Sequence, residues 1–209
     1  MTNILLIIFI ISLLYFAIAN RLMTYVKIIA LQGVILFGVA FIELLEINVI
    51  NLILILLETI IVKAVMIPAF MSYVIRKNKI TREAEPFLPN FLSLIIVTGI
   101  IIGTFIIASF IDDPNLHKIY FVTALSALFC GFFFISSRRK IITHVICYVI
   151  IENGVVILSL AVGNEMPMLV NLGILLDVFV SVFLLGIFIN KIGDVMGEGD
   201  VGSLNRLKD

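Results

Sequence analysis

The sequence predicts an all-α integral membrane protein, on three observations. Hydrophobic residues make up 62% of the 209 residues and charged residues only 13%, against about 45–50% and about 25% in a soluble domain. The apolar residues fall into seven runs, each long enough to cross a hydrocarbon core about 30 Å thick as a helix. None of the runs alternates polar and apolar residues, which disfavours a transmembrane β-barrel. A soluble globule is excluded.

Seven transmembrane spans are predicted, separated by polar or proline-containing segments. They cover approximately residues 3–19, 26–44, 48–75, 90–111, 119–137, 141–163 and 167–190. The first run lacks a basic region before it and a small-residue cleavage motif after it. We therefore expect it to be a retained span and not a signal peptide.

The basic residues predict the orientation of the spans. Twelve of the 14 basic residues follow odd-numbered spans, whereas Lys118 follows an even-numbered one and Lys63 lies inside a span. By the positive-inside rule, the N-terminus is outside and the C-terminus is cytoplasmic. The chain then divides into spans 1–3 with their cytoplasmic loop (1–89), span 4 with an external loop (90–118), a three-helix unit (119–191) and a cytoplasmic tail (192–209).

Charged residues deep inside the predicted spans are the strongest functional signal. There are four: Glu58, Lys63, Glu152 and Asp177. Each costs about 2.5–3.5 kcal/mol at the bilayer centre, and such residues usually face protein or water and serve transport. At a rise of about 1.5 Å per residue, Glu152 and Asp177 lie about 18 and 21 Å from the basic end of their spans, near one plane. We expect a row of groups that pass protons; the alternative is structural ion pairs or neutral acids that fix helix packing.

Neighbouring residues suggest how these charges are arranged. Glu58 and Lys63 are five residues apart, about 140° around an α-helix, so we expect each to find partners on other helices or other subunits. A lysine opposite a carboxylate can switch that group's charge state. His144 is a candidate proton donor to Glu152, the alternative being a solvated interfacial histidine. Pro68 either frees a carbonyl that solvates a water or cation beside Lys63, or makes an ordinary kink.

Small and polar residues inside the spans can serve transport or helix packing. Gln32, Asn51, Ser93, Asn153 and Asn171 either extend a wet polar path or link helices. Span 4 contains Gly99-x-x-x-Gly103, which we interpret as a site of generic tight helix packing more than as a dimerisation signal.

Spans 1–3 and 5–7 share a faint pattern. Gln32-Gly33 corresponds to Glu152-Asn153-Gly154, and Glu58 corresponds to Asp177, at offsets of 119 to 120 residues. Four spans separate equivalent helices, so both copies would cross in the same direction, as a parallel repeat about an axis along the membrane normal. Chance similarity between apolar helices is the other explanation, and both stay open.

Charge and cysteine content exclude other classes. The net charge is zero, so no basic surface indicates nucleic acid binding. Cys130 and Cys147 lie in apolar runs and form no CxxC pair, and the two histidines, His117 and His144, are far apart. We therefore expect no disulfide framework, no metal site and no cofactor in this chain.

Several motifs together resemble one membrane-protein family, hydrogenase-4 component E. This family supplies a membrane subunit of group 4 membrane-bound nickel–iron hydrogenase and formate hydrogenlyase complexes. The resemblance rests on four stretches: Ile61-Val-Lys63-Ala-Val-Met-Ile-Pro68, Tyr148-Val-Ile-Ile-Glu152-Asn153-Gly154, Gly173-Ile-Leu-Leu-Asp177-Val-Phe, and Asp200-Val201-x-x-Leu204-x-x-Leu207-Lys208.

Spans 5–7 are also similar to the K subunit of respiratory complex I and the C subunit of multisubunit Na⁺/H⁺ antiporters. Glu152 matches the glutamate of the K subunit's second helix, and Asp177 matches that of the third, with aspartate replacing glutamate. Arg138 and Arg139 match a basic pair that closes the first helix. Glu58 matches no motif of the family.

The resemblance implies a non-catalytic subunit of a complex I-like respiratory or membrane-bound hydrogenase complex in the cytoplasmic (inner) membrane of a prokaryote. The implied partners are antiporter-like membrane subunits, a subunit like the complex I H subunit, and a peripheral arm that holds the nickel–iron site and iron–sulfur clusters. Glu152, Asp177, Lys63, Glu58 and His144 are the expected ion-translocating residues, with H⁺ or Na⁺ as the ion. A subunit of a multisubunit cation/proton antiporter and a membrane assembly scaffold are the alternatives.

Overall fold

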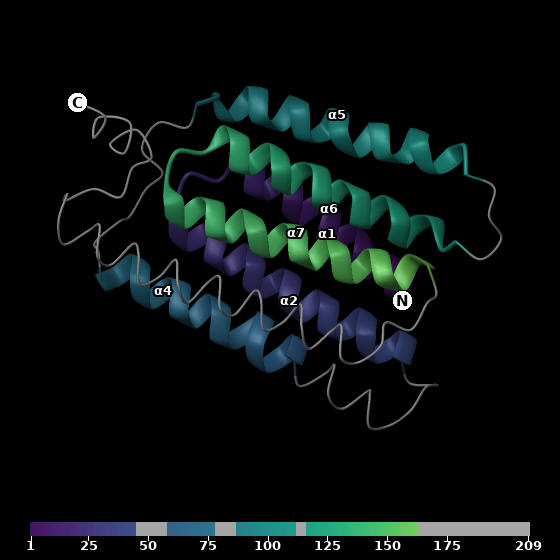
Figure 1. Cartoon of the computed structure of the whole chain (residues 1–209), viewed down its shortest axis with the longest axis horizontal. Coiled ribbons are helices and arrows are strands. Elements are labelled where there is room, and N and C mark those ends of the chain that lie inside the picture. The colour runs from purple at the N-terminus through teal and green to yellow at the C-terminus, as the bar shows by residue number, and fades with distance from the viewer. Residues whose placement is uncertain (45–57, 78–86, 112–115, 163–209) are drawn as a thin grey trace, which may run out of the picture.

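The computed structural model describes residues 1–44, 58–77, 87–111 and 116–162, with only the backbone given for Glu43, Leu44, Glu58, Thr59 and Val62 (Figure 1). Every secondary-structure element in these ranges is a helix, in agreement with the predicted all-α class. Four helices are long and apolar enough to cross a membrane, and a fifth, Thr2–Ile18, is slightly shorter. The chain is therefore a helical, multi-pass membrane protein by length and composition.

The helices lie close to the predicted spans. Their bounds are α1 Thr2–Ile18, α2 Leu22–Leu44, η1 Glu58–Met66, α4 Ile67–Lys77, α5 Asn90–Ser109, α6 Lys118–Ser137 and α7 Ile141–Val162. The predicted seventh span, with Asp177, and the tail 192–209 lie outside the described residues. The total of seven spans, their orientation and the repeat accordingly stay predictions.

Successive helices form a bundle with α5 at one edge and α4 at the opposite edge (Figure 1). The side chain of Asn90 donates to the carbonyl of Ile18 at 3.1 Å, which places the start of α5 beside the end of α1. The backbone N–H of His117 donates to the carbonyl of Ala161 at 3.1 Å, which places the start of α6 beside the end of α7. The helices α1 and α5 thus run in opposite directions, and so do α6 and α7.

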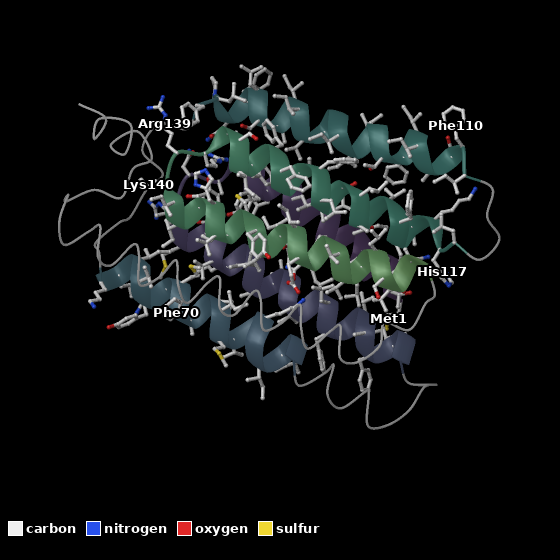
Figure 2. The ribbon with its side chains drawn as sticks, in the orientation of Figure 1. Met1, Phe70, Phe110, His117, Arg139 and Lys140 are labelled. Atoms are coloured by element: carbon white, nitrogen blue, oxygen red, sulfur yellow. The ribbon has the colours of Figure 1, made fainter. Side chains whose placement is uncertain are left out.

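The two ends of the bundle differ in charge. Figure 2 shows Arg139 and Lys140 at one end, and Met1, Phe110 and His117 at the other. This arrangement is the one that the positive-inside rule requires of the predicted orientation.

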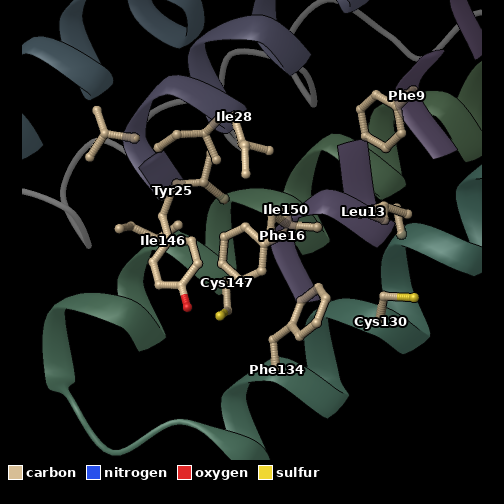
Figure 3. Packing of buried hydrophobic residues seen from close by; sticks show 14 of the residues in the cluster. Phe9, Leu13, Phe16, Tyr25, Ile28, Cys130, Phe134, Ile146, Cys147 and Ile150 are labelled. Atoms are coloured by element: carbon tan, nitrogen blue, oxygen red, sulfur yellow. The ribbon is translucent and has the colours of Figure 1, made fainter. Parts of the chain in front are cut away.

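The interior is packed with apolar side chains (Figure 3). Phe16 of α1 stacks on Tyr25 of α2 with ring centroids 4.2 Å apart, and lies 4.6 Å from the ring of Phe134 of α6. Cys130 and Cys147 are both fully buried free thiols in this cluster. Their role here is that of small buried hydrophobes.

The start of α2 differs from the prediction. We expected the span to begin near residue 26, but α2 begins at Leu22, so Lys27 lies inside the helix and not at its boundary. A lysine near a helix end is tolerated there because its long side chain can carry the ammonium toward the interface.

The glycines of α5 also differ from the prediction. A Cβ added at Gly99 or Gly103 would meet no atom within 4 Å, so the described helices do not make the tight packing predicted at these glycines. The helix contacts α1 and α6 through another face, which includes the buried Ser93, Val97 and Ile101.

Candidate functional site: a buried ion pair and an amide chain

A lysine and a glutamate from distant parts of the chain form an ion pair inside the bundle. The ammonium of Lys63 in η1 donates to Oε1 of Glu152 in α7, 89 residues away. Lys63 is 3% exposed and Glu152 is 4% exposed. Glu152 lies about midway along α7, so the pair sits at the depth where charges are most costly. Among the described residues, each charge is therefore paired with the other.

The helix that carries Lys63 is not an ordinary α-helix. Residues Glu58–Met66 form a π-helix, directly before Pro68 in α4. A π-helical stretch can re-satisfy backbone carbonyls that a proline leaves without a donor, and such stretches are frequent at functional sites. The predicted separation of 140° between Glu58 and Lys63 assumed an α-helix, whereas η1 is a π-helix. The expectation that Lys63 finds its partner on another helix is confirmed by Glu152. The side chain of Glu58 lies outside the described residues.

A chain of hydrogen bonds starts at the residue after Glu152. Nδ2 of Asn153 donates to Oε1 of Gln32 in α2 at 3.3 Å, and Nε2 of Gln32 donates to Oγ of Ser12 in α1 at 2.9 Å. The hydroxyl of Ser12 in turn donates to the carbonyl of Phe9 at 2.6 Å. All three side chains are buried. The chain thus links α7, α2 and α1 across the bundle.

Close backbone contacts hold these polar residues in place. A Cβ on Gly33 would lie 2.9 Å from Cα and N of Ala64, so the backbones of α2 and η1 touch beside Lys63. A Cβ on Gly154 would lie 2.9 Å from Cβ of Ala127 in α6. Because glycine alone permits these approaches, Gln32-Gly33 and Asn153-Gly154 each combine a polar group with a tight helix contact.

Two acceptor atoms of the cluster can still accept a hydrogen bond. Oε2 of Glu152 and Oδ1 of Asn153 are buried and have no hydrogen-bond partner within the described ranges. A buried carboxylate oxygen without a partner is a site that a proton or a hydrogen-bond donor can occupy with a gain in free energy. The amides of Asn153 and Gln32 do not titrate, so they orient the site and do not carry protons. Their hydrogen bonds link α7, α2 and α1, which is one of the two roles predicted for these residues.

The predicted site residues are only partly brought together. Lys63 and Glu152 meet directly. His144 lies on α7 about 12 Å along the axis from Glu152, and its Nδ1 is 2.9 Å from the carbonyl of Lys140. Asp177 is outside the described residues, as is the side chain of Glu58. Sequence reasoning missed Ser12, because serine is a common residue type in apolar helices. Its role becomes visible only through its hydrogen bond with Gln32.

Arg138 is a further buried charged residue, beside Lys63 and Glu152, and the sequence did not reveal its burial. We placed it in a polar loop, yet it is 1% exposed. Its Nη2 donates to the carbonyl of Ala17 at 3.2 Å, and its guanidinium lies 5.5 Å from the ring centre of Tyr25. The positive charge thus sits at the C-terminal end of α1, where the helix dipole is negative. Arg138 ties the ends of α1, α2 and α6 together.

Comparison with known proteins gives one relative and no family. The chain is 23% identical over 189 residues to the uncharacterized protein Rv0085 of Mycobacterium tuberculosis, across 88% of this chain and 85% of that protein. No protein-family model matches the chain. No solved structure matches it. The similarity covers nearly the whole length of both proteins, and the relative's description names no activity.

Proposed function

We propose that the chain is a non-catalytic membrane subunit of a complex I-like respiratory or membrane-bound hydrogenase complex of the formate hydrogenlyase type. In it, charged residues within the membrane contribute to the translocation of H⁺, or of Na⁺, coupled to electron transfer. The observation that carries the proposal is the buried Lys63–Glu152 ion pair, in which Oε2 of the carboxylate has no partner in the described chain. Intramembrane charges of this kind typically mark ion pathways.

The pair has a simple means of coupling charge to ion movement. When Glu152 accepts a proton on its second oxygen, the attraction to Lys63 is lost and the ammonium is left buried without a counter-charge. That state is costly, so a proton on one partner favours release of a proton from the other. Asp177, Glu58 and His144 are the proposed further stations. Electron transfer belongs to partner subunits that hold the nickel–iron site and the iron–sulfur clusters.

The membrane topology that the proposal uses is the predicted one. Seven spans cross the cytoplasmic membrane of a prokaryote, with the N-terminus outside and the C-terminus in the cytoplasm. Spans 1–3 and 5–7 form a parallel repeat. The alternating helix directions and the basic end of the bundle support this topology. Antiporter-like subunits, a subunit like the complex I H subunit and a peripheral hydrogenase arm are the proposed partners.

An assembly scaffold is the second candidate, and a specific observation favours it. The Asn153–Gln32–Ser12 hydrogen bonds and the ion pair connect α7 to α2, α1 and η1, which is sufficient to specify how the helices pack. In that case the charges serve structure and no ion moves along them.

Purification from native membranes in mild detergent, together with gradient measurements, tests the proposal. We expect a hydrogenase or dehydrogenase arm to co-purify with the chain; antiporter subunits without redox centres would favour the antiporter alternative. In everted vesicles, the Glu152→Gln complex that still assembles should retain redox turnover and lose most of the ion gradient. Glu152→Asp, which retains the carboxyl group, is the matched control. An undiminished gradient in an assembled Glu152→Gln complex would contradict the proposal.

A further inference from the structure

We infer that a groove between α1 and α2 binds one anionic phospholipid, with its phosphate beside Lys27 and Tyr15 and one acyl chain along the neighbouring aliphatic side chains. The groove has a volume of about 240 Å³. Ile8 and Ile11 of α1 line one wall, and Ile28 and Leu31 of α2 line the other. Nothing in this inference depends on the function proposed above.

The lining residues change from polar to apolar with depth. At about 1.5 Å per residue, Tyr15 lies about 4.5 Å from the end of α1, and Lys27 lies about 7.5 Å from the adjoining start of α2. Ile8 and Leu31 lie about 15 and 13.5 Å from the same end. The ammonium and the phenol thus sit at headgroup depth while the aliphatic walls continue toward the bilayer centre. A phospholipid has the same order of groups along its length.

Two of the three polar side chains that line the groove, those of Tyr15 and Lys27, form no hydrogen bond or ion pair within the described residues. Ser12, by contrast, is used by Gln32 and Phe9. Tyr15 is 55% exposed and Lys27 is also exposed. Both donors can therefore reach a ligand without breaking any contact of the fold.

The positive charge of Lys27 favours an anionic lipid as the molecule in the groove. The exposed ammonium of Lys27 stands at the polar end of an aliphatic groove, and a basic residue near the membrane surface attracts anionic lipid. A helix of another subunit would have to bring a carboxylate to this depth to satisfy Lys27. An anionic lipid carries its phosphate at that depth as part of its structure. Arg21, exposed at the same end of α2, adds a second positive charge.

Native mass spectrometry of the full chain in detergent tests the inference, with phosphatidylglycerol and phosphatidylcholine of identical acyl chains as probes. We expect one phosphatidylglycerol to be retained in preference to phosphatidylcholine. Lys27→Gln should lower that retention about fivefold, and Tyr15→Phe should lower it less. Lys77→Gln is the matched control, because it removes one exposed charge at the end of α4, outside the groove.

Three results would overturn the inference. The first is equal retention of the two lipids. The second is equal loss of phosphatidylglycerol in Lys27→Gln and Lys77→Gln. The third is a groove covered by a second copy or another subunit, seen as a complex that retains no lipid and that Lys27→Gln dissociates. Lys27 and Tyr15 are surface residues, so neither variant should disturb folding.

Discussion

Asn153 of α7 donates a hydrogen bond to Gln32 of α2 at 3.3 Å, although 121 residues separate them. The predicted repeat places Gln32 opposite Glu152, the residue before Asn153, so the two hydrogen-bonded residues are equivalent to within one position. Phe16 and Phe134, 118 residues apart, also lie in contact, at 4.6 Å between ring centroids. Residues close to a two-fold axis meet their own equivalents, so contacts of this kind are what the predicted parallel repeat requires, and the repeat stays a prediction. They also make the α2–α7 contact the centre of the bundle.

The amide contact between Gln32 and Asn153 should be measurable as a coupling energy. Gln32→Leu and Asn153→Leu each leave a buried amide without its partner, which should cost about 1–3 kcal/mol of unfolding free energy. The double variant should cost less than the sum by about 0.5–1.5 kcal/mol, the range for hydrogen bonds between membrane helices. Reversible unfolding in detergent gives the four values. Strictly additive effects would show that the two amides do not interact.

Gly33 should be intolerant of a side chain, whereas Gly99 should not. In Gly33→Ala the new Cβ would lie 2.9 Å from backbone atoms of Ala64, so α2 and η1 must separate. Overpacking of this kind typically costs about 1–3 kcal/mol. Gly99→Ala meets no atom within 4 Å and should be neutral or stabilise the helix by up to about 1 kcal/mol. Melting temperatures of the two variants provide the check, and equal values would contradict the close approach.

Replacing one partner of the ion pair should destabilise the protein more than replacing both. Glu152→Leu leaves the ammonium of Lys63 buried and unpaired, which should cost about 3–5 kcal/mol. Adding Lys63→Met to that variant should restore most of the lost stability, because two apolar side chains replace two charges. Thermal unfolding of the three proteins measures this. A double variant less stable than Glu152→Leu would contradict the direct pairing.

The predicted orientation can be tested without removing the native cysteines. Cys130 and Cys147 are fully buried, so a membrane-impermeant maleimide should leave both unlabelled in the folded protein. Ser136→Cys, exposed at the basic end, should react only in inside-out vesicles, and His117→Cys should react only in right-side-out vesicles. Labelling with the opposite sidedness would reverse the orientation.

The sequence predicted the described helices to within a few residues at most of their ends, because hydrophobic length largely decides where a chain crosses a membrane. It also predicted that Lys63 and Glu152 need partners, because the cost of a charge depends on depth and not on detailed packing. Their mutual pairing could not be predicted, since it depends on the π-helical geometry of η1 and on the contact at Gly33. Nor could the burial of Arg138, because a loop arginine can turn outward or inward with the same sequence signal.

The proton gradient formed by a complex that carries a reversed ion pair tests the central claim most directly. Lys63→Glu combined with Glu152→Lys keeps two opposite charges in the same place, so the helices should pack and the complex should assemble. We predict that the complex with this double variant assembles normally. Everted vesicles that contain it should form less than about a tenth of the wild-type gradient, because the carboxylate and the ammonium have exchanged positions. A wild-type gradient in the reversed pair would contradict the account and leave the charges with a structural role alone.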